Sequence, residues 1–80
     1  MPHVNLKIAG GQSDTVKRQL ADAFVASLVG IAGADPNQVS VAIEDIEPRH
    51  WARDVYDQAI APRSETLYRR PGYNPDQLPR

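Results

Sequence analysis

The sequence predicts an α+β domain built on one strand–helix–strand unit, in which two parallel strands pack against one long helix. Residues 2–8 and residues 39–46 each alternate apolar and polar side chains, with the period of two that is typical of a strand with one buried face. The stretch between them repeats its apolar residues at helical spacing. Because strands joined through a helix pair in parallel, we expect one sheet with a right-handed crossover.

The first strand reads Pro-His-Val-Asn-Leu-Lys-Ile, and Gly10 and Gly11 break it. Ser13 suits the N-cap of the following helix, because its hydroxyl can accept a hydrogen bond from a backbone N–H of the first turn. Gly30 and Gly33 are expected to end that helix. Its apolar stripe is expected to comprise Val16, Leu20, Phe24, Leu28 and Ile31.

The second strand reads Val-Ser-Val-Ala-Ile-Glu-Asp-Ile and is rich in β-branched residues. Pro48 suits the first turn of a short second helix, on which Trp51 and Val55 share one face. The remainder holds Pro62 and three further prolines and is expected to be mostly irregular, with residues 66–68 forming a brief strand or turn.

Length and composition restrict the class of protein. With 80 residues the chain is one domain at most, and we expect a domain over residues 1–73 and a flexible C-terminal tail over residues 74–80. The absence of cysteine excludes disulfides, and His3 and His50 lie too far apart in sequence to suggest a structural metal site. The balanced charge argues against a nucleic-acid partner. No apolar run suits a membrane span or a signal peptide, so we expect a cytoplasmic protein without membrane association.

The predicted fold is incomplete in a single copy. Two strands under one helix leave a sheet face and both edges uncovered, and isolated two-stranded pieces are marginally stable in water. A domain this short also buries only about 60% of the surface of its unfolded chain. We therefore expect a homo-oligomer in which a second copy completes the sheet.

These segments together resemble the 4-oxalocrotonate tautomerase superfamily, and within it the small bacterial tautomerases with a C-terminal extension. The resemblance rests on the Met-Pro start of the first strand, the Gly-Gly-Gln-Ser-Asp segment, the Val-Ser-Val-Ala-Ile strand, the Pro-Arg-His-Trp segment and the ending Thr-Leu-Tyr-Arg-Arg-Pro-Gly-Tyr. It implies the βαβ tautomerase (MIF-like) fold, completed by oligomerisation. It also implies a keto–enol tautomerase with no metal and no cofactor. By resemblance the extension favours a dimer over a hexamer.

In that family the initiator methionine is removed and the new N-terminal proline is the catalytic base, which here is Pro2. A good general base titrates near the working pH. A secondary amine is more basic than that, so desolvation or nearby cations must lower its pKa. We expect an apolar pocket formed by Val41 and Trp51 to supply the desolvation. If Met1 stayed attached, the Pro2 nitrogen would be an amide without a basic lone pair.

The chain departs from the family at the substrate-binding positions. The best-studied members hold arginines where this chain has Gln12 and Ser40, and Trp51 replaces a commoner phenylalanine as the aromatic wall. Without those two cations a dicarboxylate suits the site less well than an enol or 2-oxo monoacid with an aromatic or apolar body, such as a phenylpyruvate-like enol. Gln12, Ser40 and Trp51 are still expected to bind substrate. The candidates for a replacement cation are Arg49, Arg53, Arg69 and Arg70, and of these Arg53 and Arg70 are expected to bind substrate.

Two further functions stay open. The superfamily includes dehalogenases, hydratases and decarboxylases that use the same proline, and for these Glu44 and Asp45 are the available carboxylates. The other alternative is a catalytically inactive oligomeric module that binds a partner or a small molecule.

Overall fold

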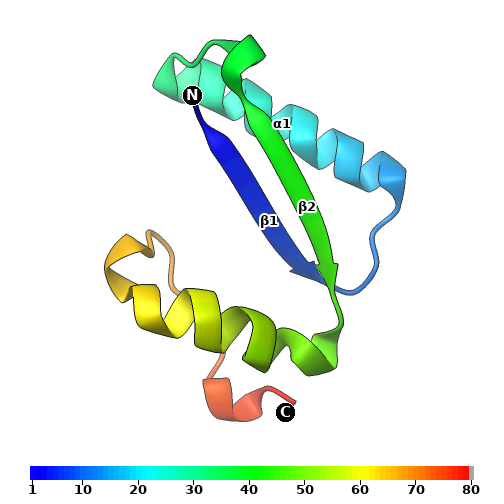
Figure 1. Cartoon of the computed structure of the whole chain (residues 1–80), viewed down its shortest axis with the longest axis vertical. Helices are drawn as coiled ribbons and strands as arrows, with labels where there is room; N and C mark the ends of the chain where they lie inside the picture. Colours follow the sequence, from blue (N-terminus) through cyan, green and yellow to red (C-terminus); the bar gives the residue numbers. More distant parts are fainter. Residues whose placement is uncertain (80) are drawn as a thin grey trace. The chain divides into compact units, whose positions relative to one another are not determined.

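The computed structural model describes residues 1–79, in which a strand, a helix and a second strand are followed by a series of short helices (Figure 1). The chain forms two units, Met1–Asp45 and Ile46–Arg80. The first, called the N-terminal unit here, carries the sheet and the long helix. The second, the C-terminal unit, carries the short helices.

The N-terminal unit is the predicted strand–helix–strand unit. Strands β1 (His3–Ala9) and β2 (Ser40–Ile46) form a two-stranded sheet. Their arrows point the same way in Figure 1, and α1 (Asp14–Ala32) lies across one face of the sheet. The prediction of two parallel strands joined through one long helix is therefore confirmed, with strand bounds within one residue of those expected.

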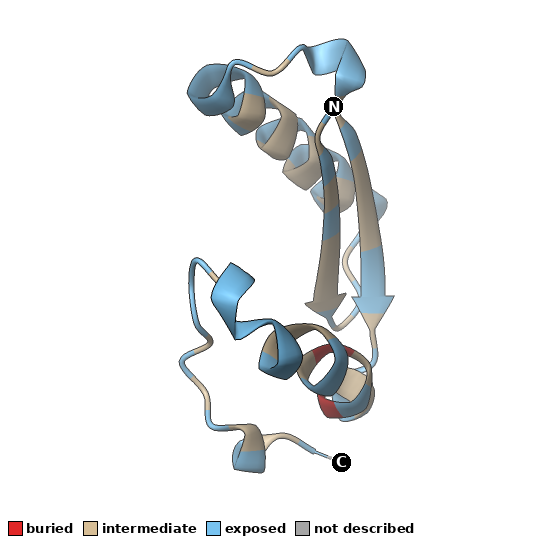
Figure 2. Ribbon diagram, turned by 60° about the vertical axis from the view of Figure 1, so that its left-hand side comes forward, coloured by how far each residue is buried: buried red, intermediate tan, exposed pale blue. Residues whose placement is uncertain are grey.

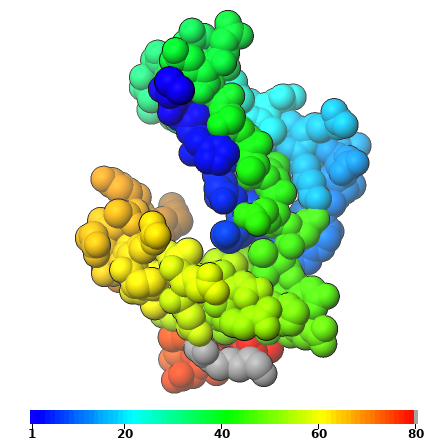
Figure 3. All heavy atoms as spheres, in the orientation of Figure 1, coloured from blue at the N-terminus to red at the C-terminus, as the bar shows by residue number. Residues whose placement is uncertain are grey.

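The two faces of the sheet differ in character. Val41 and Ile43 line a hollow together with residues of α1, so they face the helix. On the opposite face the side chain of His3 contacts Ser40 and that of Lys7 contacts Glu44. In Figure 3 the atoms of both strands face the viewer on this side, uncovered by α1. The N-terminal unit thus presents a polar face that its own helix does not cover.

Helix α1 begins and ends where the capping residues predict. The Ser13 hydroxyl accepts from the Val16 N–H at 3.2 Å. Gly33 follows the helix with φ 68° and ψ 24°, a left-handed conformation that favours glycine because it has no Cβ. Its N–H donates to the carbonyl of Val29 at 3.1 Å. Gly30, also expected to end the helix, instead lies within it, so that part of the prediction is wrong.

The apolar stripe of α1 is only partly covered. Leu20, Phe24 and Leu28 are half-buried as predicted. Val16 and Ile31, also predicted for the stripe, are 36% and 88% exposed. Ile31 lies in the last turn, where no described residue packs over it. No residue of the N-terminal unit is buried, and Figure 2 shows no red there. The side chains between α1 and the sheet therefore pack against one another without forming an enclosed core.

The C-terminal unit is more helical than predicted. It comprises η2 (Pro48–His50), the π-helical η3 (Ala52–Ile60), η4 (Ala61–Thr66) and η5 (Pro75–Gln77). The predicted start at Pro48 is confirmed, but the expectation of irregular structure up to Thr66 is wrong. Pro62 does not prevent η4 because it lies in the first turn, where no intrahelical N–H is needed. Ala52 and Val55, at 1% and 5% exposure, are the buried residues of the described chain.

The C-terminal segment holds a short capped helix. The Asn74 side chain accepts from the Asp76 N–H at 3.0 Å, and the Gln77 side chain accepts from the Asn74 N–H at 3.0 Å, which together form a capping box. The flexibility expected for residues 74–80 stays a prediction, and Arg80 lies outside the described residues. Within residues 1–79 no helix is long and apolar enough to cross a membrane.

Candidate active site

Pro2 lies half-buried immediately before β1. Its carbonyl accepts a hydrogen bond from the Ser40 N–H at 3.2 Å, which joins it to the start of β2. Met1 is 99% exposed. Removal of Met1 would therefore disturb no packing, and it would convert the Pro2 nitrogen from an amide into a secondary amine held at the end of a strand.

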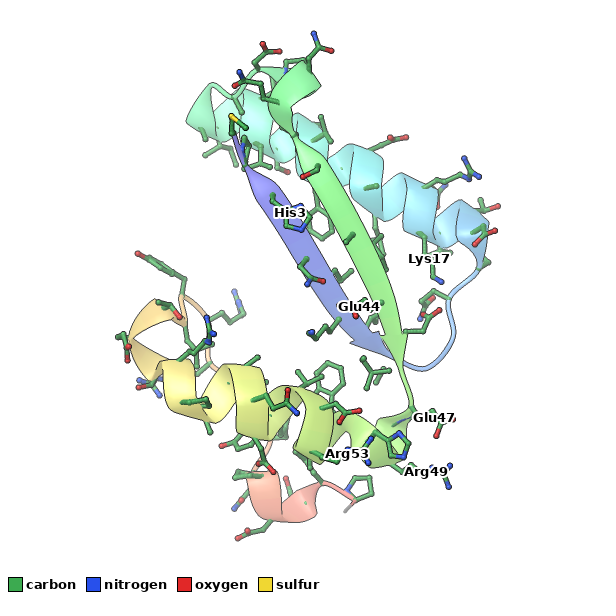
Figure 4. All side chains as sticks on the ribbon, viewed as in Figure 1. His3, Lys17, Glu44, Glu47, Arg49 and Arg53 are labelled. Carbon is green, nitrogen blue, oxygen red and sulfur yellow. The ribbon has the colours of Figure 1, made fainter. Side chains whose placement is uncertain are left out.

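Ser40 forms a side-chain pair that the sequence did not predict. Its hydroxyl lies 2.6 Å from His3 Nδ1, and both residues are exposed. Figure 4 shows the His3 ring beside β2. His3 had no predicted role, although the parallel register of the strands sets Ser40 beside residues 2 and 3 and is the signal that indicates the pair. Binding of substrate by Ser40 stays a prediction, and its hydroxyl is already engaged by the imidazole.

Gln12 lies near a cation that the sequence analysis also missed. The Gln12 N–H donates to Asp45 Oδ1 at 3.4 Å, while Lys17 Nζ lies 2.5 Å from Asp45 Oδ2. The hydrogen bond from Lys17 lowers the pKa of the Asp45 carboxyl, and the same bond raises the pKa of Lys17. The ammonium of Lys17 is thus neutralised within the chain.

Gln12 and Pro2 lie at opposite ends of the sheet. Pro2 is beside the first residue of β2, whereas Gln12 is beside Asp45, near its last residue. The seven residues of β1 at about 3.3 Å each separate the two ends by roughly 20 Å. A small acid cannot contact both residues within one chain, so the structure does not bring these predicted site residues together.

Trp51 anchors an aromatic cluster in the C-terminal unit. Its indole Nε1–H donates to the Tyr73 hydroxyl at 3.0 Å. The rings of Tyr73 and Tyr56 lie 6.1 Å apart at 55°, a tilted arrangement that aromatic pairs favour. The predicted contact of Trp51 with Pro2 joins residues of different units and stays a prediction.

The candidate cations differ in their partners. Arg53 donates to both carboxylate oxygens of Asp54, at 2.6 and 3.0 Å, and this hydrogen bonding raises the pKa of the guanidinium. Arg49 donates to Glu47 at 2.9 Å, and Figure 4 shows Glu47, Arg49 and Arg53. Arg70 makes no ion pair with any other residue between 1 and 79.

Arg70 borders a cavity of about 280 Å³ within the C-terminal unit. Most of the lining is apolar or aromatic. The lining residues are Tyr56, Ile60, Ala61, Ser64, Leu67, Arg70, Pro71 and Tyr73. Such a cavity combines aliphatic and aromatic side chains with hydroxyl groups, and one positive charge lies at its border.

The described residues hold no group of three or more histidine, cysteine, aspartate or glutamate side chains placed to bind one metal ion. The acidic side chains near the sheet are instead paired with lysines, Glu44 with Lys7 at 3.4 Å and Asp45 with Lys17. The carboxylates of β2 thus form ion pairs.

Known proteins resemble this chain over most of its length. The family described as tautomerase enzyme matches residues 2–57. A probable tautomerase of Xylella fastidiosa is 42% identical over 73 residues, covering 91% of this chain and 89% of its own. Tautomerase PptA of Cronobacter sakazakii is 36% identical over 74 residues, covering 91% and 97%. Two solved structures share the fold over more than half of the chain. YwhB, a homologue of 4-oxalocrotonate tautomerase, is 28% identical with a TM-score of 0.58, over 61% of this chain and 80% of its own. A heterohexameric 4-oxalocrotonate tautomerase of Chloroflexus aurantiacus is 25% identical with a TM-score of 0.60, over 64% and 82%.

Proposed function

The chain belongs to the tautomerase family, and we propose that it is a cofactor-independent keto–enol tautomerase in which Pro2, freed of Met1, is the general base. Ketonisation of an enol acid moves one proton from the hydroxyl oxygen to carbon. The Pro2 amine takes the proton from oxygen as the carbonyl forms, and the ammonium then supplies a proton to the carbon. No oxidant, reductant or second substrate is needed.

The observation that carries this proposal is the position of Pro2 beside an exposed Met1. The hydrogen bond between the Pro2 carbonyl and the Ser40 N–H at 3.2 Å fixes the residue without using its nitrogen. Since Met1 is 99% exposed, an aminopeptidase can reach it. The product would carry a basic secondary amine in a defined place, which general base catalysis requires.

The substrate class follows from the charges at the two ends of the sheet. Gln12 and Ser40 are neutral where the best-studied relatives carry arginines, the Ser40 hydroxyl already contacts His3, and the nearby Lys17 is paired with Asp45. Binding two carboxylates needs two available cations, and these positions supply none. We therefore propose a small enol or 2-oxo monoacid with an aromatic or apolar body, of the phenylpyruvate type.

We also propose that the chain forms a homo-oligomer, and that this oligomer is a dimer and not a hexamer. Residues 1–45 contain no buried side chain, and Ile31 is 88% exposed. Gln12 and Pro2 lie at opposite ends of the sheet, so a site that used both would take one residue from each of two copies. A location in the cytoplasm, expected from the sequence, stays a prediction.

The test begins with the intact mass, which shows whether Met1 is present. The ketonisation of phenylenolpyruvate is then followed for the natural chain and for Pro2→Ala, with Pro79→Ala as the control. Pro2→Ala should lower kcat/KM by about 10²–10⁴-fold, while Pro79→Ala should not change it. A version of the chain that keeps an extra residue before Pro2 should be as inactive as Pro2→Ala, because the ring is present but the nitrogen is an amide.

Equal rates for the natural chain, Pro2→Ala and the blocked chain would reject Pro2 as the base and favour an inactive binding module. Turnover of haloacrylates without ketonisation would instead assign the proline to dehalogenation. The ketonisation rates and the turnover of haloacrylates can both be measured on the same purified samples.

A further inference from the structure

We propose that the cavity of the C-terminal unit binds a monocarboxylic acid with an aromatic or apolar body, and that Arg70 holds its carboxylate. The ligand class rests on the proposed tautomerase function, which the cavity deepens by assigning the residue that recognises the acid. The cavity is formed by η3, η4 and the segment around residues 67–73.

The state of the arginines selects Arg70. Arg53 is held by both oxygens of Asp54, so an incoming carboxylate would have to displace an existing partner. Arg70 has no ion-pair partner within the described part of the chain, and no carboxylate lines the cavity that it borders. Arg69 precedes it and is absent from the lining. The charge available to an acid in this cavity is therefore that of Arg70.

The other polar groups of the lining suit an acceptor ligand. The Tyr73 hydroxyl oxygen accepts from Trp51 Nε1 at 3.0 Å. A phenol has one O–H donor of its own, so the hydrogen of Tyr73 is left to donate to another group. Ser64 adds a hydroxyl to the lining. Together with the forked N–H groups of Arg70, these donors match the oxygens of a carboxylate.

The rest of the cavity suits an apolar body of about one ring. Ile60, Leu67 and Pro71 supply aliphatic surface, and Tyr56 supplies an aromatic ring tilted against Tyr73. The volume of about 280 Å³ lies at the small end of ligand sites, which run from about 300 to 1,000 Å³. A second carboxylate would find no second cation in this lining, which is unfavourable for a charged group that leaves water.

A hollow of similar size in the N-terminal unit lacks these features. It measures about 290 Å³ and is lined by Asp14, Lys17, Arg18, Ala21, Val41 and Ile43. Its lining includes the cation Arg18, but the Asp14 carboxylate would repel an acid, Lys17 is held by Asp45, and no aromatic residue lines it. The comparison favours the cavity of the C-terminal unit.

The fluorescence of Trp51, the one tryptophan of the chain, gives a direct binding assay because its indole contacts Tyr73 in the cavity wall. The probe is 3-phenylpropanoate, which cannot enolise as a 2-oxo acid does, and 3-phenylpropan-1-ol serves as its uncharged match. Arg70→Gln should weaken phenylpropanoate binding at least about tenfold, the effect of losing about 1.4 kcal/mol. Binding of the alcohol should not change. Arg69→Gln, next to it in sequence, should bind both probes as the natural chain does.

Equal losses in Arg70→Gln and Arg69→Gln would overturn the proposal, because a general surface charge would then explain the binding. So would equal affinity of the natural chain for the acid and the alcohol. The same titration in Pro2→Ala separates this inference from the proposed function. Arg70-dependent binding by the natural chain, if that chain ketonises nothing, rejects the catalytic proposal alone. Ketonisation with an unchanged KM in Arg70→Gln rejects the cavity alone.

Discussion

Two glycines at the end of α1 should respond to the same substitution with opposite signs. Gly30 lies within the helix and Gly33 follows it with φ 68°. A Cβ built at either position meets no atom within 4 Å, so steric clashes contribute to neither. Alanine favours a helix interior over glycine by about 1 kcal/mol. In the left-handed conformation an L-residue is disfavoured by about 1–2 kcal/mol. Gly30→Ala should therefore stabilise the protein by about 1 kcal/mol, and Gly33→Ala should destabilise it by about 1–2 kcal/mol.

Thermal unfolding followed by circular dichroism measures both changes. Each kcal/mol shifts the Tm of a domain of this size by about 4–8 °C, so the two variants should differ by about 8–24 °C. All samples need one protein concentration, because association stabilises the folded state by mass action. Destabilisation by Gly30→Ala would refute the reasoning, since it would mean that another molecule packs against this turn. Equal Tm values for both variants would refute the left-handed cap at Gly33.

Burial and charge give two further predictions. Val55→Ala should destabilise by about 2 kcal/mol, from two lost methyl groups and the space they leave, because Val55 is 5% exposed. Val29 lies in α1 and is 38% exposed, so Val29→Ala should change the unfolding free energy by less than about 0.5 kcal/mol. Unfolding in urea measures the free energy of unfolding of Val55→Ala and of Val29→Ala. Asp45→Asn should cause a small loss of stability near neutral pH. Since the native pKa of Asp45 is lowered, this loss should fade as the pH drops below about 4, the ordinary range of an aspartate. It should also fade as the pH rises above the ordinary lysine pKa of 10.5 and through the raised pKa of Lys17. A pH-independent difference would exclude the ion pair as its source.

Local signals in the sequence were sufficient to predict the strands and the helix of the N-terminal unit. The alternation in both strands, the Ser13 hydroxyl and the glycine at position 33 each act within a few residues, so pattern and capping rules locate the elements. Ile31 was misplaced because periodicity assigns it to a helix face but says nothing about how far the strands extend beneath that face. Its 88% exposure depends on contacts between distant segments.

The candidate site was predicted less completely, because its contacts also join segments that are distant in sequence. Pro2 could be named from the sequence because the family resemblance fixes it at the chain's start. The pair of His3 with Ser40 depends on the register of two strands 37 residues apart in sequence. The pair of Lys17 with Asp45 depends on how α1 packs beside β2. The cavity beside Arg70 depends on helical structure in residues 61–66, where the prolines suggested irregular chain.

The positions of the available cations bear on which acid the protein can bind. Cations at the two ends of the sheet could bind the two carboxylates of a diacid. In this chain those positions hold the neutral residues Gln12 and Ser40, and the nearby Lys17 is paired with Asp45. With Arg70 as the anchor of the acid, recognition of negative charge lies in the C-terminal unit and involves a single cation. It follows that Arg70→Gln should raise KM for phenylenolpyruvate while kcat changes little, whereas Pro2→Ala should lower kcat. A lowered kcat with unchanged KM in Arg70→Gln would place this arginine at the reacting atoms instead.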